Sequence, residues 1–380
     1  MELGGIERAL LGFFEQLDFT QYEVDLFIHR HSGELMPCIP QQVKVLSELQ
    51  PYALLTQPIT ECIKQGFIRI ALARLWAKLK ATFYNIFNSK EENDSIFQYV
   101  AMATERFLPA MSNTQYDVAI SFITPHVFVL SKVNALKKIA WIHTDYASVN
   151  INTRAEFNTW KAYDAIVAVS DQAKAAFLNR FKGITNKVYV FENPLPIQLI
   201  KRESMAFVPT LSNGINFLTV GRFCYAKAQE EAVAIAYELV QKGWDIHWYF
   251  IGYGNEQPFW QAVGTYKLQD RVHHLGKLAN PYPYMLACDY YVQPSRYEGK
   301  AVTVQEAQAL HKTVIITNYN TAPSQLEHGK NGFIVPMGIE AAANVIHNLL
   351  LKQSKIEFEQ PSIAQNQINF AHRFQALMSI

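Results

Sequence analysis

Two carboxylates lie eight positions apart in the second half of this 380-residue chain, Glu298 and Glu306. Glu298 falls in an expected loop after an apolar segment, and Glu306 falls on the helix expected to begin near Val302. Gly299 permits a sharp turn between them, and the first N–H groups of such a helix lack an intrahelical partner. Unpaired N–H groups favour an anionic ligand. The pattern therefore predicts an anion site, although a lone glutamate is more often a solvated surface residue.

Cationic side chains follow an earlier apolar segment in the same half of the chain. Gly221 lets the backbone approach a ligand, and Arg222 and Lys227 can bring two positive charges to one diphosphate. Gly252 ends a further apolar segment in the run Gly-Tyr-Gly, which is a weak signal alone. Isolated cations are more often solvated surface charge, so a diphosphate site requires that these residues gather in one place.

Parallel β-sheets are the elements that would position these residues. Short β-branched and aromatic segments alternate with helical stretches, twice along the chain, and this alternation is typical of sheets with helices on both faces. Strands are expected at 24–29, 43–46, 118–122, 139–143, 165–169, 188–191, 216–220, 246–251, 272–275, 290–292, 314–317 and 333–335.

The two prolines in the segment 192–196 interrupt this alternation, and we place an interdomain hinge there. The sequence thus predicts an α/β fold with two doubly wound, Rossmann-like domains facing a cleft, residues 1–195 and 196–360. A C-terminal helix at about 361–380 would pack back on the first domain. Ligands of such sheets bind at the carboxyl ends of the strands.

Taken in order, the motifs between 214 and 336 resemble those of retaining GT-B glycosyltransferases with the E-x7-E motif. This family 4-like group assembles bacterial capsular and other surface polysaccharides. The resemblance implies that Glu306 holds the ribose hydroxyls, that Arg222 and Lys227 hold the diphosphate, and that Glu298 contacts the transferred sugar. It also implies that donor-binding backbone groups lie at Gly221, Gly252, Gly299, Lys300, Ala301 and Val302.

The N-terminal half carries two weaker parts of the same resemblance. Gly4 and Gly5 look like the Gly-Gly loop at a helix N-terminus, and His143 looks like the strand-end histidine that contacts the donor sugar. A lone strand-end histidine is also often structural. The chain departs from the family in lacking the apolar first strand before Gly4, in having Ala228 where glycine is common, and in having Lys300 and Ala301 after the Glu-Gly pair.

The resemblance implies a metal-independent, retaining transferase that moves a hexose from a nucleotide diphosphate sugar, with a UDP-sugar favoured, to a glycan or lipid-linked acceptor. No cofactor is expected, and the sequence has no DxD pair for a divalent cation. A noncatalytic sugar-nucleotide-binding or scaffold subunit, an epimerase and a phosphorylase stay open as alternatives. A dehydrogenase is disfavoured because no GxGxxG motif follows a first strand.

Bulk composition limits partners and compartment. The net charge of +1 offers no general attraction for nucleic acid. Four dispersed cysteines indicate reduced thiols, and no signal peptide or membrane-spanning segment is evident, so we expect a cytoplasmic protein.

The segment 64–83 carries an apolar stripe at helical spacing with cations along both borders. The stripe contains Ile68, Leu72, Leu75, Trp76, Leu79 and Phe83, bordered by Arg69 and Lys80 on one side and by Lys64, Arg74 and Lys78 on the other. Such a helix could contact an anionic membrane that presents a lipid-linked acceptor. Packing of the stripe on the sheet, with the cations extending to water, is the favoured interpretation.

Overall fold

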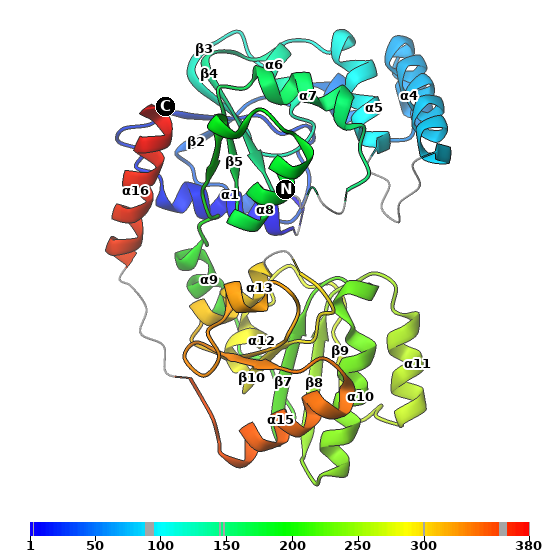
Figure 1. The fold of residues 1–380 in the computed structure, drawn as a ribbon, viewed down its shortest axis with the longest axis vertical. Coiled ribbons are helices and arrows are strands. Elements are labelled where there is room, and N and C mark those ends of the chain that lie inside the picture. The colour runs from blue at the N-terminus through cyan, green and yellow to red at the C-terminus, as the bar shows by residue number, and fades with distance from the viewer. Residues whose placement is uncertain are drawn as a thin grey trace. The chain divides into compact units, whose positions relative to one another are not determined.

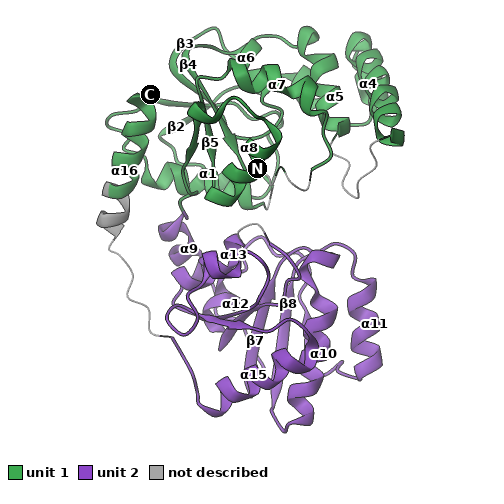
Figure 2. Ribbon diagram, in the orientation of Figure 1, with its two compact units in different colours: residues 1–194, 362–380 green, residues 195–361 purple. Residues whose placement is uncertain are grey.

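A computed structural model describes residues 1–2, 4–87, 95–143, 146, 149–298, 301–356 and 363–379. The chain divides into two compact units (Figure 2). Unit 1 comprises Met1–Pro194 and Ser362–Ile380, and unit 2 comprises Leu195–Pro361.

Unit 2 is a six-stranded parallel sheet with the order β12-β11-β10-β7-β8-β9 (Figure 1). Its strands are β7 (Ile215–Val220), β8 (Ile246–Ile251), β9 (Val272–His274), β10 (Tyr290–Gln293), β11 (Thr313–Thr317) and β12 (Phe333–Val335). Its helices are α9 (Ile197–Ser204), α10 (Gln229–Gln241), α11 (Gln257–Tyr266), α12 (Tyr282–Ala287), α13 (Val302–Ala309), α14 (Ala322–Gln325) and α15 (Ile339–Leu351).

Apolar side chains on both faces of this sheet explain its double layer of helices. Phe217 on β7 is buried with Val233 of α10 and Ile346 of α15. The next residue, Leu218, points to the opposite face and is buried with Met285 of α12 and Val304 of α13. Strands buried on both faces read as continuous apolar runs, which is why every strand expected in this half forms.

The connection order of unit 2 selects one edge of the sheet for binding. The chain proceeds from β7 outward to β9 and then returns to β10, on the other side of β7. The loops after β7 and β10 therefore leave neighbouring strands in opposite directions, and at this point, outside the carboxyl ends of the strands, sheets of this kind bind ligands in a crevice. The loop with Arg222 and Lys227 follows β7, and the loop with Glu298 follows β10.

Unit 1 contains two separate parallel sheets, a pair β1-β2 and a four-stranded sheet β3-β4-β5-β6. The strands are β1 (Val24–Leu26), β2 (Val43–Val45), β3 (Gln115–Ser121), β4 (Asn134–Ile142), β5 (Ala165–Ala168) and β6 (Val188–Val190). Its helices are α1 (Gly5–Gln16), α2 (Gln50–Ala53), α3 (Ile59–Lys64), α4 (Ile68–Phe87), α5 (Ser95–Thr104), α6 (Val127–Lys132), α7 (Thr153–Ala162), α8 (Asp171–Arg180) and α16 (Ile363–Ser379).

The two sheets of unit 1 are not paired to each other by a strand in the part of the chain that the structure describes. Within the described residues no strand precedes α1, and no strand joins β1 to β3. A side-chain hydrogen bond links the two sheets instead, from the Tyr116 hydroxyl to Oδ2 of Asp25 at 2.7 Å.

Aromatic rings hold the C-terminal helix of unit 1 against its first helix. The ring of Phe13 on α1 lies 5.3 Å from that of Phe370 and 5.1 Å from that of Phe374, both on α16, in edge-to-face geometry. Such pairs add roughly 0.5–1.5 kcal/mol each beyond the area they bury. The ammonium of Lys137 on β4 also donates to the carbonyl of Met378 at 2.9 Å.

The favoured interpretation of the segment 64–83 is wrong. The apolar stripe is exposed: Trp76 is 57% exposed and Phe83 is 65% exposed. Small residues on the opposite face of α4 are buried instead, because they let the helix approach its neighbours closely. Arg74 does not border the stripe, since it is buried and donates to the carbonyls of Leu54 and Gln57, both at 2.7 Å.

Candidate functional site

An ion pair joins the two loops at the crevice of unit 2. The ammonium of Lys227 lies 2.5 Å from Oε1 of Glu298, with the side chains 21% and 11% exposed. The Ser295 hydroxyl donates to the same oxygen at 2.6 Å, and the amide of Gln293 donates to it at 3.3 Å. Three donors thus converge on one carboxylate oxygen, which holds Glu298 and Lys227 at the carboxyl ends of β10 and β7.

Buried hydrogen bonds hold Gln293, which donates to Glu298 of this ion pair, in position. Oε1 of Gln293 accepts from the hydroxyl of Tyr291 at 2.7 Å and from that of Thr303 at 3.3 Å. Burial raises the pKa of Tyr291, so its hydroxyl remains a proton donor. Sequence analysis did not identify Gln293. The available signal was an amide at the end of an otherwise apolar strand, where a buried polar group needs partners.

Glu306 lies on α13 and is fully buried. Its Oε1 accepts a hydrogen bond from the hydroxyl of Tyr282 at 2.9 Å. Burial is the main cause of the raised pKa of Tyr291, and the charges of Glu306 and Glu298 raise it further. The structure therefore brings Lys227 and Glu298 into direct contact, whereas the described hydrogen bond of Glu306 is with Tyr282.

Arg222 lies in the same loop as Lys227, directly after Gly221. Its side chain is exposed, and among the described residues its guanidinium makes no hydrogen bond or ion pair. Its carbonyl accepts from the amide of Gln229 at 3.0 Å, which fixes the backbone beneath it. The guanidinium is therefore available to an anion at the crevice.

Arg296 fastens the two loops to each other. Its guanidinium donates to Glu230 at 2.7 Å and to Glu231 at 2.6 Å, both in the first turn of α10, and stacks 4.1 Å from the ring centroid of Tyr225. Its backbone N–H donates to the carbonyl of Ala226 at 2.8 Å. Sequence analysis gave Arg296 no role, because its partners lie more than 60 positions away.

One glycine shapes the Arg222 loop sterically. A Cβ at Gly252 would lie 1.9 Å from the carbonyl oxygen of Gly221, so only glycine allows the loops after β7 and β8 to meet there. Gly221 itself would tolerate a Cβ, which would lie 3.6 Å from the nearest carbon of Lys227. Ala228 adopts the left-handed conformation at φ 51°, which accounts for the glycine common at this position in the family.

The N-terminus of α13 is fixed by α14. Ala301 is the buried N-cap residue before Val302, and its carbonyl accepts from the amide of Gln325 at 2.6 Å. The hydroxyl of Thr321 donates to the carbonyl of Glu298 at 2.8 Å. Two expected donor-binding residues, Gly299 and Lys300, lie outside the described residues.

The expected site residues of unit 1 lie at the start of α1 and after β4. Gly4 is the N-cap residue of α1 and Gly5 its first residue. A Cβ on Gly4 would lie 2.2 Å from a carboxylate oxygen of Glu7. The Glu7 side chain thus folds back toward the N-terminus of α1, where the helix dipole favours a negative charge.

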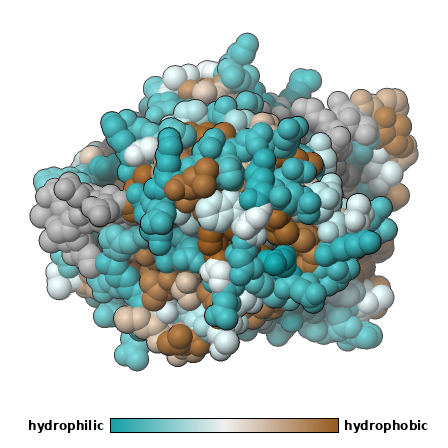
Figure 3. Space-filling model, turned by 90° about the horizontal axis from the view of Figure 1, so that it is seen from below, coloured by the Kyte–Doolittle hydropathy of each residue, from teal (hydrophilic) through white to brown (hydrophobic). Residues whose placement is uncertain are grey.

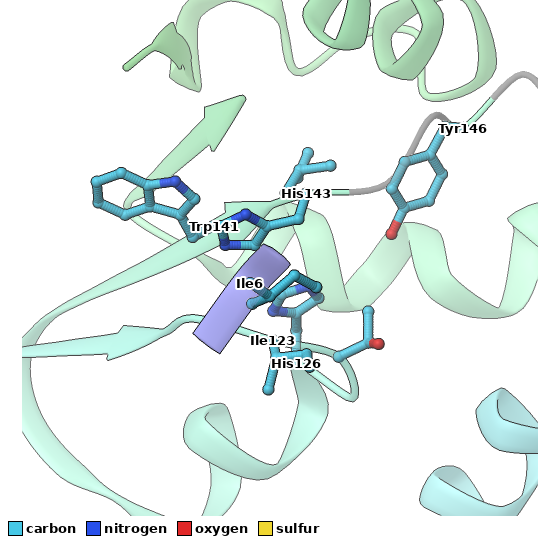
Figure 4. A pocket seen from close by; sticks show the side chains of 8 residues that line it. Ile6, Ile123, His126, Trp141, His143 and Tyr146 are labelled. Atoms are coloured by element: carbon cyan, nitrogen blue, oxygen red, sulfur yellow. The ribbon is translucent and has the colours of Figure 1, made fainter. Parts of the chain in front are cut away.

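His143 borders a cavity of about 90 Å³ in unit 1 (Figure 4). The cavity is lined by Ile6, Ile123, Thr124, His126, Trp141, Ile142, His143 and Tyr146. Nδ1 of His143 is 3.1 Å from the Asn193 amide nitrogen, and Nε2 has no hydrogen-bond partner within the described part of the chain. Burial lowers the pKa of His143 to about 4 and that of His126 to about 3, so both rings are neutral near pH 7.

Neither a metal cluster nor a membrane-spanning helix is present in the described part of the chain. No three His, Cys, Asp or Glu side chains there come together as metal ligands. No helix there combines the length and the hydropathy that crossing a bilayer requires.

Comparison with known proteins supports one class of enzyme. Residues 201–366, which cover almost all of unit 2, match the family model of glycosyl transferases group 1. An uncharacterized glycosyltransferase of Methanocaldococcus jannaschii is 23% identical over 268 residues, which are 63% of this chain and 65% of that protein. This chain therefore spans less than two thirds of that relative's length.

Solved structures match over both units. A glycosyltransferase from Rickettsia africae aligns with a TM-score of 0.63 at 18% identity, over 93% of this chain and 86% of that chain. HepE of Anabaena, solved in complex with UDP-glucose, aligns with a TM-score of 0.60 at 16% identity, over 100% and 92%. Likeness at this identity concerns the fold, which is the two-domain GT-B fold. The match to glycosyl transferases group 1 thus covers residues 201–366, and these neighbours show the fold of the chain.

Proposed function

We propose that this protein is a retaining glycosyltransferase that transfers a hexose from a UDP-sugar to a glycan or lipid-linked acceptor in surface polysaccharide biosynthesis. The observation that carries the proposal is the Lys227–Glu298 ion pair at the carboxyl ends of β7 and β10. The buried carboxylate of Glu306 lies on α13 and accepts a hydrogen bond from Tyr282 of α12. A cation and two carboxylates at such a crevice suit a ligand with a diphosphate and hydroxyl-rich sugars.

Sugar transfer would proceed on this framework as follows. The acceptor oxygen forms a bond to C1 of the sugar, and the bond from C1 to the β-phosphate oxygen breaks with its electron pair leaving on UDP. The acceptor proton passes to that phosphate oxygen. Negative charge grows on the diphosphate, so Arg222, Lys227 and the N-terminus of α13 would stabilise the transition state more than the ground state.

The remaining contacts follow from the placement of the carboxylates and His143. Glu306 would accept hydrogen bonds from the ribose hydroxyls, and Glu298 from the hydroxyls of the transferred sugar. The unpartnered Nε2 of the neutral His143 ring would meet the sugar as a hydrogen-bond donor, since Nδ1 faces the amide nitrogen of Asn193. Gly4 and Gly5 would approach the donor at the start of α1.

The UDP-glucose complex of HepE favours UDP as the nucleotide and a hexose as the transferred sugar. Retention and the role in surface polysaccharides rest on the resemblance of the motifs. We propose that no metal or cofactor takes part, because Arg222 and Lys227 supply the positive charge. Four free cysteines accord with a cytoplasmic location, at the inner face of the membrane where a lipid-linked acceptor would be presented.

A screen of nucleotide sugars tests the proposal. The donor should raise the thermal unfolding temperature, since a ligand at one hundred times its Kd adds about 2.7 kcal/mol of stability. It should also release UDP when an acceptor is present, and this release should persist in EDTA. NMR of the product should show the anomeric configuration of the donor.

A noncatalytic binding subunit and an epimerase would each give a different result in that screen. Stabilisation by UDP-sugars without turnover, across a panel of glycan and lipid-linked acceptors, indicates a noncatalytic binding subunit. Conversion of one UDP-sugar into another indicates an epimerase. Loss of all turnover in EDTA with recovery on adding Mg²⁺ would overturn the metal-independent mechanism while leaving the transferase assignment in place.

A further inference from the structure

Helix α4 exposes a continuous row of large apolar side chains, which we call the α4 face. Each of them is between 46% and 82% exposed, and the most exposed is Phe87. The α4 face consists of Ile68, Leu72, Leu75, Trp76, Leu79, Phe83, Ile86 and Phe87. At the α-helical rotation per residue these positions fall within roughly 120° of the helix circumference. Exposed apolar patches of this kind mark interaction surfaces.

The side of α4 opposite the α4 face holds the helix in place. The opposite side of α4 carries Ile70 and four alanines, all buried, and α5 packs beside α4 (Figure 1). The buried guanidinium of Arg74 ties the helix to the carbonyls of Leu54 and Gln57. In the space-filling view, brown side chains gather at the upper right edge, the side on which α4 lies in Figure 1 (Figure 3).

The exposed charges of α4 are all positive and lie at the borders of the α4 face. The helix has no acidic residue, and its exposed cations are Arg69, Lys78 and Lys80. At helical spacing Arg69 and Lys80 fall along one border and Lys78 along the other. The ammonium of Lys80 lies 5.3 Å from the ring centroid of Trp76, so the aliphatic stem of the lysine lies along the face. Lysines at such borders extend their charges to the polar interface.

We propose that the α4 face docks on the surface of an anionic lipid bilayer, with the helix axis in the plane of the interface. The apolar side chains would enter the boundary between headgroups and acyl chains, and the three cations would pair with lipid phosphates. The site lies wholly in unit 1 and does not depend on the sugar-transfer chemistry proposed for unit 2.

Charge complementarity selects the bilayer over a second copy of the chain. Two copies meeting through the α4 face would bring two sets of Arg69, Lys78 and Lys80 together, and the helix carries no carboxylate to compensate them. An anionic membrane supplies that compensation, and each cation near it strengthens binding about fivefold.

Binding to vesicles tests this inference. The 380-residue protein should sediment with vesicles of phosphatidylglycerol and phosphatidylcholine, and more weakly with phosphatidylcholine alone. The double variant Trp76→Ser, Phe83→Ser should bind at least tenfold more weakly to both. The double variant Lys78→Gln, Lys80→Gln should lose up to about 25-fold on the anionic vesicles, with little change on the neutral ones.

A matched control uses exposed aromatic residues of unit 2. Trp260 is 47% exposed and Phe207 is 46% exposed, and the variant Trp260→Ser, Phe207→Ser should bind vesicles like the wild type. Circular dichroism and thermal unfolding should show that all variants fold. The inference is overturned if the wild type does not bind anionic vesicles, or if the Trp76, Phe83 variant binds them equally well. It is also overturned if the wild type is a dimer in solution that this variant dissociates.

Discussion

The ammonium of Lys227 contacts the carboxylate of Glu298 at 2.5 Å, although the two residues stand 71 positions apart in the chain. The contact spans the loops after β7 and β10, on the two sides of the point where the chain reverses its direction across the sheet. Each side chain is mostly buried, so the field of this pair is screened less than that of a surface pair. The cation is thus held in position before any ligand arrives.

Replacing Lys227 by alanine should lower kcat for sugar transfer about 10²–10³-fold, because one preorganised donor to the departing diphosphate is lost. Initial-rate kinetics with the donor found in the screen measure this effect. Lys242→Ala, an exposed lysine of the same unit, serves as the control and should keep wild-type rates. Unchanged kcat in Lys227→Ala would mean that the ion pair only holds the loops together.

The ion pair should also couple Lys227 and Glu298 in folding. In a double-mutant cycle with Lys227→Ala and Glu298→Gln, urea unfolding should give a coupling free energy of about 1 kcal/mol or more. Arg202 and Glu203 are adjacent in sequence and form an exposed ion pair, with side chains 69% and 31% exposed. A double-mutant cycle on this pair should give a coupling free energy of about 0.5 kcal/mol or less. Equal coupling free energies in the two cycles would contradict the conclusion that partial burial strengthens the Lys227–Glu298 ion pair.

Tyr282→Phe should raise the KM for the donor about tenfold with a smaller effect on kcat. The hydroxyl of Tyr282 donates to the buried Glu306, and a hydrogen bond to a charged group contributes about 1.5–3 kcal/mol. Without it, Glu306 would hold the ribose less well. Tyr284→Phe, on the same helix, removes a hydroxyl with no hydrogen bond among the described residues and should leave KM unchanged.

Acid should lower the unfolding free energy of unit 1, because His143 is buried there in its neutral form. Burial lowers its pKa in the folded state to about 4, while the unfolded residue keeps a value near 6.5. Between these values the unfolded state binds more protons, so this contribution to stability is complete above pH 6.5 and is lost as the pH falls to about 4. The titration of His143 alone changes the unfolding free energy by about 3 kcal/mol at most.

The comparison of wild type with His143→Gln isolates this effect. Glu156, whose pKa burial raises to about 7, acts in the opposite direction between about pH 4.5 and 7 but is present in both proteins. The difference in unfolding free energy between wild type and variant should therefore grow in favour of the wild type from pH 4 to pH 6.5. A difference that is independent of pH would show that the ring is not protected from protons.

Lys267→Gly should stabilise unit 2 by about 1 kcal/mol, which chemical denaturation can measure. Lys267 is exposed and ends α11 in the left-handed conformation, with φ 53°, where only glycine avoids a steric penalty. Lys242 ends α10 with φ −84°, so Lys242→Gly should give no gain. A gain from both substitutions, or from neither, would argue against the backbone explanation.

Local patterns in the sequence determined the elements. Every expected strand forms, because strands of parallel sheets are short apolar runs bounded by glycine, proline and polar residues, and this signal is contained in each segment itself. The order of the strand-end motifs also indicated which loops carry charge. Lys227 and Glu298 are in contact, as the charged loops after β7 and β10 suggested, while the site roles of Lys227, Glu298 and Glu306 stay predictions.

Only the tertiary structure decided which residues those elements contact. Three features arise between segments far apart in the chain: the Lys227–Glu298 ion pair, the contacts of Arg296 with α10 and the steric need for glycine at position 252. The outward direction of the α4 face was likewise undetermined, because an amphipathic helix can bury either its large apolar side chains or a row of alanines. Packing against neighbouring helices selected the alanine face, which allows closer approach, and left Trp76 and Phe83 exposed.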